Sequence, residues 1–190
     1  MTIELINKLF ALGVVAGQIA IVAAVLHFIF FRKKPYPLAT FISQRGLLLA
    51  FIISLVATAG SLFYSQIAGF EPCQLCWFQR IFMYPEVLLL GLALLKKDSS
   101  IVDYALSLSI VGGALSLYHN YIYYSNGGLN AICQVLGQGV SCMKRYVFEL
   151  GYVTIPMMSL TTFLLMIVLL VMHRMYIMGH MSIGSREPKS

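Results

Sequence analysis

The sequence has few charged residues. They make up 11% of its 190 positions, whereas hydrophobic residues make up 59%. Soluble domains average about 25% charged residues, and a soluble core does not need so much apolar surface. The mean hydropathy of +0.85 fits a domain that lies in lipid. This composition excludes an ordinary soluble domain and predicts an integral membrane protein whose surroundings are the lipid bilayer.

The sequence also lacks a basic face suited to nucleic acid, although its net charge is +6. Nine of its 13 basic residues lie beside apolar segments or in the C-terminal tail: Arg32, Lys33, Lys34, Arg45, Lys96, Lys97, Arg174, Arg186 and Lys189. Such a distribution orients membrane spans, so we expect no nucleic-acid partner. There is no internal repeat and no low-complexity segment, and nothing indicates a second folded domain.

Five apolar segments are each long enough to cross a bilayer core of about 30 Å, which takes roughly 20 helical residues. They cover residues 9–31, 46–68, 77–95, 101–124 and 152–174. The first, Leu9–Phe31, is too long for the apolar region of a signal peptide, and no cleavage pattern follows it. We therefore expect a retained span and an all-α integral membrane protein with five transmembrane helices.

Basic residues gather in the first and third connections and at the start of the tail, which predicts that these regions are cytoplasmic. The N-terminus, the turn Gly69–Cys76 and the loop Ser125–Gly151 then face outward, and the C-terminus faces inward. All four cysteines lie in the outward regions, where disulfides can persist: Cys73, Cys76, Cys133 and Cys142. We expect a multi-pass protein of the cytoplasmic (inner) membrane with its cysteines on the periplasmic or extracytoplasmic side.

Cys73 and Cys76 form a CxxC pair where an outward turn becomes a helix, and Pro72 is well placed to start that helix. Unpaired backbone N–H groups and the helix dipole stabilise an anion in the first turn, which favours a reactive thiolate. The two-residue spacer lets the pair close into a disulfide without unwinding the chain. On its own, a CxxC pair is weak evidence for redox activity.

Arg80 strengthens the redox interpretation. It lies four residues after Cys76, on the same helix face and about 6 Å deeper in the membrane. A cation there needs an anionic or polar partner, unless the side chain extends back to the headgroups. Cys76, which has the best helix-terminal and cationic surroundings, is the expected thiolate. Glu86, about 15 Å beyond Cys76, should lie near the middle of the bilayer, where either a structural role or proton handling would explain it.

The outer loop holds the second pair, Cys133 and Cys142, separated by eight residues that include Gly137 and Gly139. The pair is either a structural staple or a mobile disulfide that exchanges with the CxxC pair and with a soluble partner. His119 ends the fourth span, where it is either a hydrogen-bonding residue at a helix end or a proton carrier.

Two other classes of protein have to be considered. Four cysteines on one membrane face could hold a zinc or copper ion without catalysis, which makes a non-catalytic metal-binding membrane protein the alternative function. The arginine beside the thiolate has no evident use in such a protein. The cysteines could also merely staple the outer loops of a structural subunit.

Taken together, the motifs resemble the disulfide bond formation protein B family (DsbB, with its BdbC-type branch) over about residues 44–172. The resemblance is carried by CQLCWFQR at Cys73–Arg80, MYP at Met83–Pro85, YH at Tyr118–His119, the loop pair Cys133 and Cys142, and TIP at Thr154–Pro156. The vitamin K epoxide reductase family uses similar parts, but there the loop pair precedes the CxxC pair. The order in this sequence is the reverse.

The resemblance implies a four-helix bundle that reoxidises an extracytoplasmic thioredoxin-fold oxidant (DsbA- or BdbD-like). The electrons then pass to the membrane quinone pool, either ubiquinone or menaquinone. Cys133 would form the mixed disulfide with the partner, and Cys142 would complete the loop disulfide Cys133–Cys142. Cys73 would exchange with that pair, and Cys76 of the disulfide Cys73–Cys76 would face the quinone. Arg80 would polarise the quinone and His119 would lie on the quinone side; no residue is assigned to a metal.

The sequence departs from the family pattern in its N-terminal part. The usual core has four spans with its N-terminus inside, whereas Leu9–Phe31 adds a fifth span and moves this N-terminus outside. We therefore expect residues 1–43 to hold the extra span and a cytoplasmic connection, residues 44–175 the four-helix redox bundle, and residues 176–190 a polar cytoplasmic tail. The loop pair is also closer in sequence than in the longest-loop members.

Overall fold

The computed structural model describes residues 2–30, 37–98, 100–125 and 146–184. Within these residues the chain is helical, with α1 (Thr2–Phe30), α2 (Pro37–Leu62), α3 (Gln74–Lys96), α4 (Ile101–Tyr124) and α6 (Ile155–Gly184). A π-helical turn, η1 (Phe63–Ile67), continues α2. Five helices are long and apolar enough to cross a membrane, so the expectation of an all-α membrane protein with five spans is confirmed.

The helices differ from the expected segments mainly at their ends. α2 begins at Pro37 rather than near residue 46, and α6 continues to Gly184 beyond residue 174. Hydropathy marks the apolar part of a helix, whereas polar residues such as Gln44 and Arg45 can extend the helix past the bilayer core. The fourth span has the expected bounds, and Pro156 lies in the first turn of α6.

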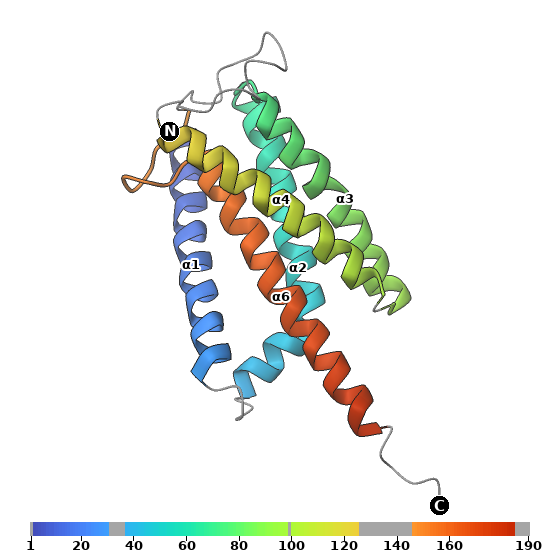
Figure 1. Ribbon diagram of the computed structural model, residues 1–190. Coiled ribbons are helices and arrows are strands. Elements are labelled where there is room, and N and C mark those ends of the chain that lie inside the picture. Colours follow the sequence, from blue (N-terminus) through green and yellow to red (C-terminus); the bar gives the residue numbers. More distant parts are fainter. Residues whose placement is uncertain (1, 31–36, 99, 126–145, 185–190) are drawn as a thin grey trace, which may run out of the picture.

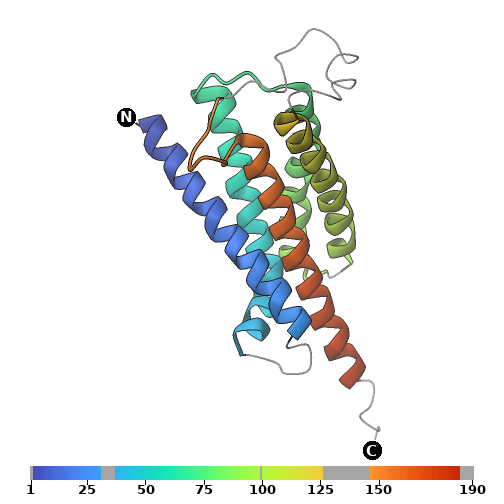
Figure 2. The same ribbon diagram turned by 60° about the vertical axis from the view of Figure 1, so that its left-hand side comes forward.

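Four helices form a bundle in which each packs against two others: α2 against α3, α3 against α4, α4 against α6, and α6 against α2. α1 lies outside this bundle and packs against α6 (Figure 2). All five helices run between the same two ends of the molecule (Figure 1). α1, α3 and α6 begin, and α2 and α4 finish, at what we call the cysteine end, because Cys73 directly precedes α3 there.

The opposite end of the bundle is closed by apolar packing. One cluster of buried side chains joins all four bundle helices there: Ala50, Leu90, Val102, Ala105, Met166, Leu169 and Leu170. Small residues let the backbones approach, as is usual between transmembrane helices. At Gly112, for example, any side chain would collide with the ring of Phe163 on α6.

Two short turns shape the cysteine end. Gly69, with a φ of 69°, lets the chain leave η1 in a left-handed conformation and turn back towards α3. Before α6, Glu149 and Val153 exchange two backbone hydrogen bonds of 3.0 and 2.8 Å, which close a tight turn. The first turn sets the approach of the chain to α3, and the second sets its approach to α6.

Candidate functional site

Cys73 and Cys76 lie together at the start of α3. Cys73 is the N-cap residue, with extended backbone angles (φ −69°, ψ 170°), and its sulfur accepts a hydrogen bond from the backbone N–H of Cys76 at 3.4 Å. The two sulfur atoms are 2.9 Å apart, and both residues are free thiols in this structure. Cys73 is buried and Cys76 is half-buried. The pair is therefore adjacent enough to form a disulfide with little movement of the chain.

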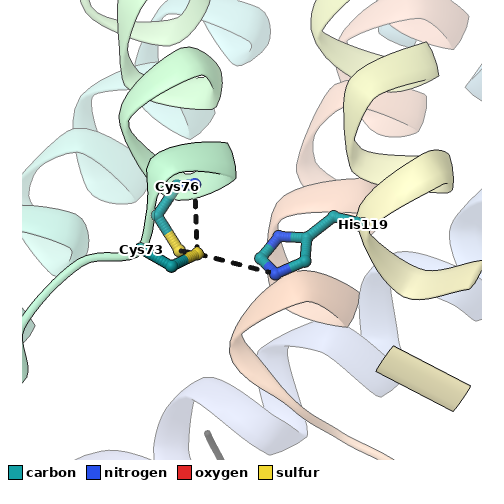
Figure 3. Close-up of side chains that lie close together, drawn as sticks. All are labelled: Cys73, Cys76 and His119. Carbon is teal, nitrogen blue, oxygen red and sulfur yellow. Dashed lines mark hydrogen bonds between the residues drawn. The ribbon is translucent and has the colours of Figure 1, made fainter. Parts of the chain in front are cut away.

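His119 on α4 faces this pair across the bundle (Figure 3). Its Nε2 atom lies 3.7 Å from Sγ of Cys73, and the side chain is only 1% exposed. The sequence placed His119 near the outer surface at a helix end, but it did not predict which cysteine it contacts. In the structure that cysteine is Cys73.

Gln79 completes this group, and the sequence analysis gave it no role. The side chain is buried, and its amide nitrogen lies 3.2 Å from Nδ1 of His119. An amide NH₂ group donates, so this contact favours the tautomer in which Nδ1 accepts and the ring proton is on Nε2, on the side of Cys73. One feature of the sequence could have identified Gln79: it is a polar amide within an apolar span, three residues after Cys76 and on the same inward helix face.

These contacts make Cys73 acidic. The hydrogen bond from the thiol of Cys76, followed by the interactions with His119, lowers the pKa of Cys73 to about 4 against the opposing effect of burial. The helix position and Arg80 had predicted the thiolate on Cys76. With both thiols reduced, the structure instead favours an anion at Cys73, because His119 lies on that side of the pair.

Arg80 is held against α2. Its Nε donates to the hydroxyl of Ser61 at 3.0 Å, and its terminal nitrogen donates to the backbone carbonyl of Ser61 at 3.1 Å. The guanidinium lies over the ring of Trp77, 5.1 Å from its centre. The polar partner that a cation at this depth requires is thus a serine of the neighbouring helix. Both hydrogen bonds fix the guanidinium one turn below Cys76.

A cavity of about 340 Å³ lies beside these residues. Its polar lining includes Cys73, Cys76, Gln79, Arg80 and His119, and most of the remaining lining is apolar and comes from α1, α2 and α6. Small-molecule sites typically have volumes of about 300–1,000 Å³, mostly apolar walls and a few convergent polar groups. The cavity therefore suits a planar, largely apolar ligand whose polar atoms meet the thiol pair and the guanidinium.

Stacked aromatic rings border the cavity at the cysteine end. Tyr64 stacks on Phe70 with ring centres 5.6 Å apart, and Phe70 stacks on Tyr146 at 4.7 Å. All three line the cavity. They come from η1, from the turn before α3 and from the segment before α6, so this stack joins three separate parts of the chain.

The same group could also hold a metal ion. The ligand atoms of Cys73, Cys76 and His119 all lie within 4.8 Å of one another. Two thiolates and one imidazole are a common part of a zinc site, which usually has four ligands. Among the described residues, these three form the group that could hold a metal ion, as non-catalytic metal binding would require.

Glu86 lies elsewhere. It is fully buried between α3 and α4, where the hydroxyl of Ser109 donates to its Oε1 at 2.8 Å. Its Oε2 has no hydrogen-bond partner among the described residues, and it does not line the cavity. The structure thus gives Glu86 a helix-packing contact and places it apart from the thiol pair.

The second predicted pair cannot be placed in the same way. Cys133 and Cys142 lie outside the described residues, so their pairing and their distance from Cys73 stay predictions.

Comparisons with known proteins agree with the motifs. The family model described as disulfide bond formation protein DsbB matches residues 43–173. The probable disulfide formation protein C 1 of Bacillus anthracis is 44% identical over 133 residues, which is 70% of this chain and 88% of that protein. Disulfide bond formation protein C of Bacillus subtilis (strain 168) is 39% identical over 119 residues, which is 63% of this chain and 85% of that protein. No solved structure matches the chain. The matched range begins after α1.

Proposed function

Since the chain belongs to the disulfide bond formation protein DsbB family, we propose that it reoxidises an extracytoplasmic thioredoxin-fold thiol oxidase and transfers the electrons to a membrane quinone. The observation that carries this proposal is the cavity whose lining includes Cys73, Cys76, Arg80 and His119. A structural disulfide needs neither a cavity nor a cation beside it. A thiol pair that passes electrons to a bound ligand needs a cavity for that ligand, and a cation beside it stabilises the negative charge that develops.

The outer half of the relay is thiol–disulfide exchange. The reduced partner attacks the disulfide Cys133–Cys142 at Cys133, and the partner leaves with a disulfide while the loop pair takes up its two electrons and two protons. The loop dithiol then reduces the disulfide Cys73–Cys76 in the same way. Each exchange breaks one S–S bond and forms another, so the electrons move inward without an external oxidant.

The inner half returns Cys73 and Cys76 to the disulfide. The Nε2–H group of His119 stabilises negative charge on Cys73, while Cys76, which lies nearer Arg80, presents its sulfur to the cavity. A quinone held in the cavity would supply the acceptor for the two electrons and two protons that Cys73 and Cys76 release when they form the disulfide. Arg80 would hold one of its oxygens, and His119 is the nearest ring able to carry a proton.

The residues fit this ligand by chemistry as well as by size. The cavity combines apolar walls, for an aromatic ring and an isoprenoid tail, with a fixed cation for a carbonyl oxygen. Arg80 already has its position set by Ser61, so a ligand does not have to order it. Nothing in this set of groups distinguishes ubiquinone from menaquinone.

The proposed orientation places the cysteine end outside the cytoplasm. Lys96 and Lys97 finish α3 at the opposite end, and basic residues near span ends favour the cytoplasmic side. The N-terminus of α1 would then be outside and the end of α6 inside. Residues 44–175 would form the redox bundle, with residues 1–43 as an added span and residues 176–190 as a cytoplasmic tail.

Purified protein, a reduced thioredoxin-fold oxidase and a quinone test the function directly. We expect one quinone to be reduced for each partner disulfide formed. Cys76→Ser should abolish this reaction, because the inner pair can no longer close. Ser107→Ala is a suitable control, since its hydroxyl bonds only to a carbonyl of its own helix near the opposite end. Full turnover by Cys76→Ser would contradict the mechanism.

The cluster of Cys73, Cys76 and His119 supports one other function, metal binding without catalysis. Metal analysis of anaerobically purified protein distinguishes the two. One tightly held zinc or copper per chain, lost in His119→Ala, would favour that function. Protein that is free of metal and active with quinone would exclude it.

A further inference from the structure

The structure places α1 against the cavity, although α1 lies outside the range that the family model matches. We infer that α1 forms a wall of the quinone site, and that the site opens to the lipid between α1 and α2, beside Gly13, Ile52 and Val56. This inference rests on the proposed function. α1 would then control how a quinone with a long apolar tail enters and leaves.

One face of α1 meets the rest of the protein. The residues that make these contacts recur at the spacing of three and four expected for one helix face: Asn7, Phe10, Ala11, Val14, Gly17 and Gln18. Ala11 and Val14 are buried, whereas the other side of α1 carries exposed apolar residues such as Leu5, Leu9 and Leu12. α1 therefore has an inner face with specific contacts and an outer face suited to lipid.

Polar contacts fix α1 at two levels. Near its start, the hydroxyl of Tyr64 donates to Oδ1 of Asn7 at 2.9 Å, and the ring of Phe10 packs on that of Tyr64. Further along, the side chain of Gln18 donates to Thr161 on α6 at 3.3 Å and accepts from the hydroxyl of Tyr152 at 2.8 Å. Hydrogen bonds between side chains in apolar surroundings give a helix a defined position and rotation.

The segment between these two levels lines the cavity. Phe10, Gly13 and Val14 of α1 belong to its lining, together with Ile52, Val56 and Gly60 of α2 and with residues of α6. Phe10 packs directly over Gly60, where an added Cβ would come within 2.9 Å of the ring. α1 and α2 therefore meet closely at Phe10, towards the cysteine end.

Below that contact, residues of both helices that line the cavity are accessible from outside. Gly13, Ile52 and Val56 line the cavity and are also exposed, with 45% of Ile52 and 52% of Val56 accessible. A Cβ added at Gly13 would meet no atom within 4 Å. All three residues lie within membrane-spanning helices, so the medium that reaches them is hydrocarbon. An opening of this kind suits a ligand whose head lies at Arg80 and whose tail extends into the lipid.

Gly13→Leu tests the inference, because it puts a branched side chain into the opening and adds a better helix former than glycine. Ala16→Leu is the matched control: Ala16 is exposed on the same helix but does not line the cavity. Two quinones with the same head should be compared, one with a ten-carbon tail and one without a tail. Binding can be followed by quenching of Trp77, the only tryptophan in the chain, which lies beside Arg80.

We expect Gly13→Leu to weaken binding of the tailed quinone about tenfold or more, the usual effect of a misplaced methylene group or two in an apolar site. Its KM for that quinone should rise similarly. The tail-less quinone, and thiol exchange between the partner and the chain, should change much less. Ala16→Leu should behave as the wild type in every assay.

Equal loss of both quinones, or no loss of either, would overturn the inference about the opening while the proposed function stands. Wild-type protein that exchanges thiols but neither binds nor reduces any quinone would instead reject the proposed function itself. Thermal unfolding of each variant shows whether the bundle is intact.

Discussion

The two ends of the four-helix bundle are built from the same kind of helix but differ in what lies between the helices. At the opposite end, Leu90, Met166 and Leu170 are fully buried in one apolar cluster. At the cysteine end, the same helices surround a cavity of about 340 Å³ with thiols, an imidazole and a guanidinium in its lining. Packing at the opposite end holds the helices in register. The cysteine end can therefore contain groups that contribute little to packing.

If this contrast is correct, changes at the cysteine end should alter chemistry, and changes at the opposite end should alter stability. The largest effect should be on the ionisation of Cys73. With Cys133 and Cys142 replaced by serine, Cys76→Ala removes the strongest hydrogen bond to Cys73, so its pKa should rise from about 4 towards the ordinary value. An ordinary thiol has a pKa of about 8.5, so the thiolate fraction at pH 6 should fall by roughly a hundredfold or more.

The rate of Cys73 alkylation as a function of pH measures this change. The sign follows from the direction of the shift: a lowered pKa keeps the thiolate present through neutral pH and loses it only in acid. Cys76→Ser in the same background is the control, because serine retains an O–H donor and should shift the midpoint less. Identical midpoints for the two variants would show that Cys76 does not set the acidity of Cys73.

Arg80→Leu should have the next largest effect. Loss of a fixed cation beside reacting groups commonly lowers turnover by about 100-fold or more. Arg80→Lys keeps the charge but cannot make the paired contacts with Ser61, so its rate should lie between those of Arg80→Leu and the wild type. Quinone reduction is the assay, and thiol exchange with the partner should stay intact in both variants. A loss of thiol exchange would mean that Arg80 supports the fold instead.

Leu90→Ala probes the closed end. Removing this fully buried side chain should lower the free energy of unfolding by about 2 kcal/mol, mainly through lost packing contacts. The KM for quinone should hardly change, because Leu90 does not line the cavity. Leu88→Ala on the exposed face of the same helix is the control, with little expected effect on either quantity. Unfolding in detergent and steady-state kinetics together separate the two ends.

The smallest effect should come from Gln79→Leu. Without the amide donor at Nδ1, His119 is free to carry its proton on that nitrogen and to lose the N–H bond to Cys73. We expect a decrease in turnover of about tenfold, together with a change in the nitrogen NMR shifts of the ring. Gln74→Leu, which changes a half-buried glutamine in the first turn of the same helix, should leave both unchanged. Unaltered ring shifts in Gln79→Leu would remove the positioning role.

Much of the fold follows from hydropathy, because a long apolar run in lipid has few options other than a helix. The five spans could be predicted on that ground, and the helix start beside Cys73 from the position of Pro72. The helix ends at Pro37 and Gly184 could not, since polar turns outside the bilayer core carry no such signal. The face of α1 that meets the bundle could not be predicted either, because α1 carries apolar side chains on all sides.

At the site, spacing along α3 predicted that Cys76 and Arg80 share a face, since helix geometry fixes that relation. Contacts between helices were beyond this reasoning. Ser61 as the partner of Arg80 and His119 as the neighbour of Cys73 depend on how α2 and α4 are rotated in the bundle. That rotation is decided by packing over the whole length of the helices. Gln79 was passed over for the same reason, because its significance lies in a residue of another helix.

The ring stack of Tyr64, Phe70 and Tyr146 also limits how this part of the chain can vary. The ring of Tyr64 stacks on that of Phe70, and its backbone carbonyl accepts a hydrogen bond from the backbone N–H of Phe70 at 2.9 Å. The hydroxyl of Tyr64 donates to Asn7 of α1. Phe70 in turn meets Tyr146 before α6. A substitution at Tyr64 or Phe70 would be felt by several segments at once, so neither position can change without compensation elsewhere. The border of the cavity therefore has little freedom to drift, even though it lies among turns.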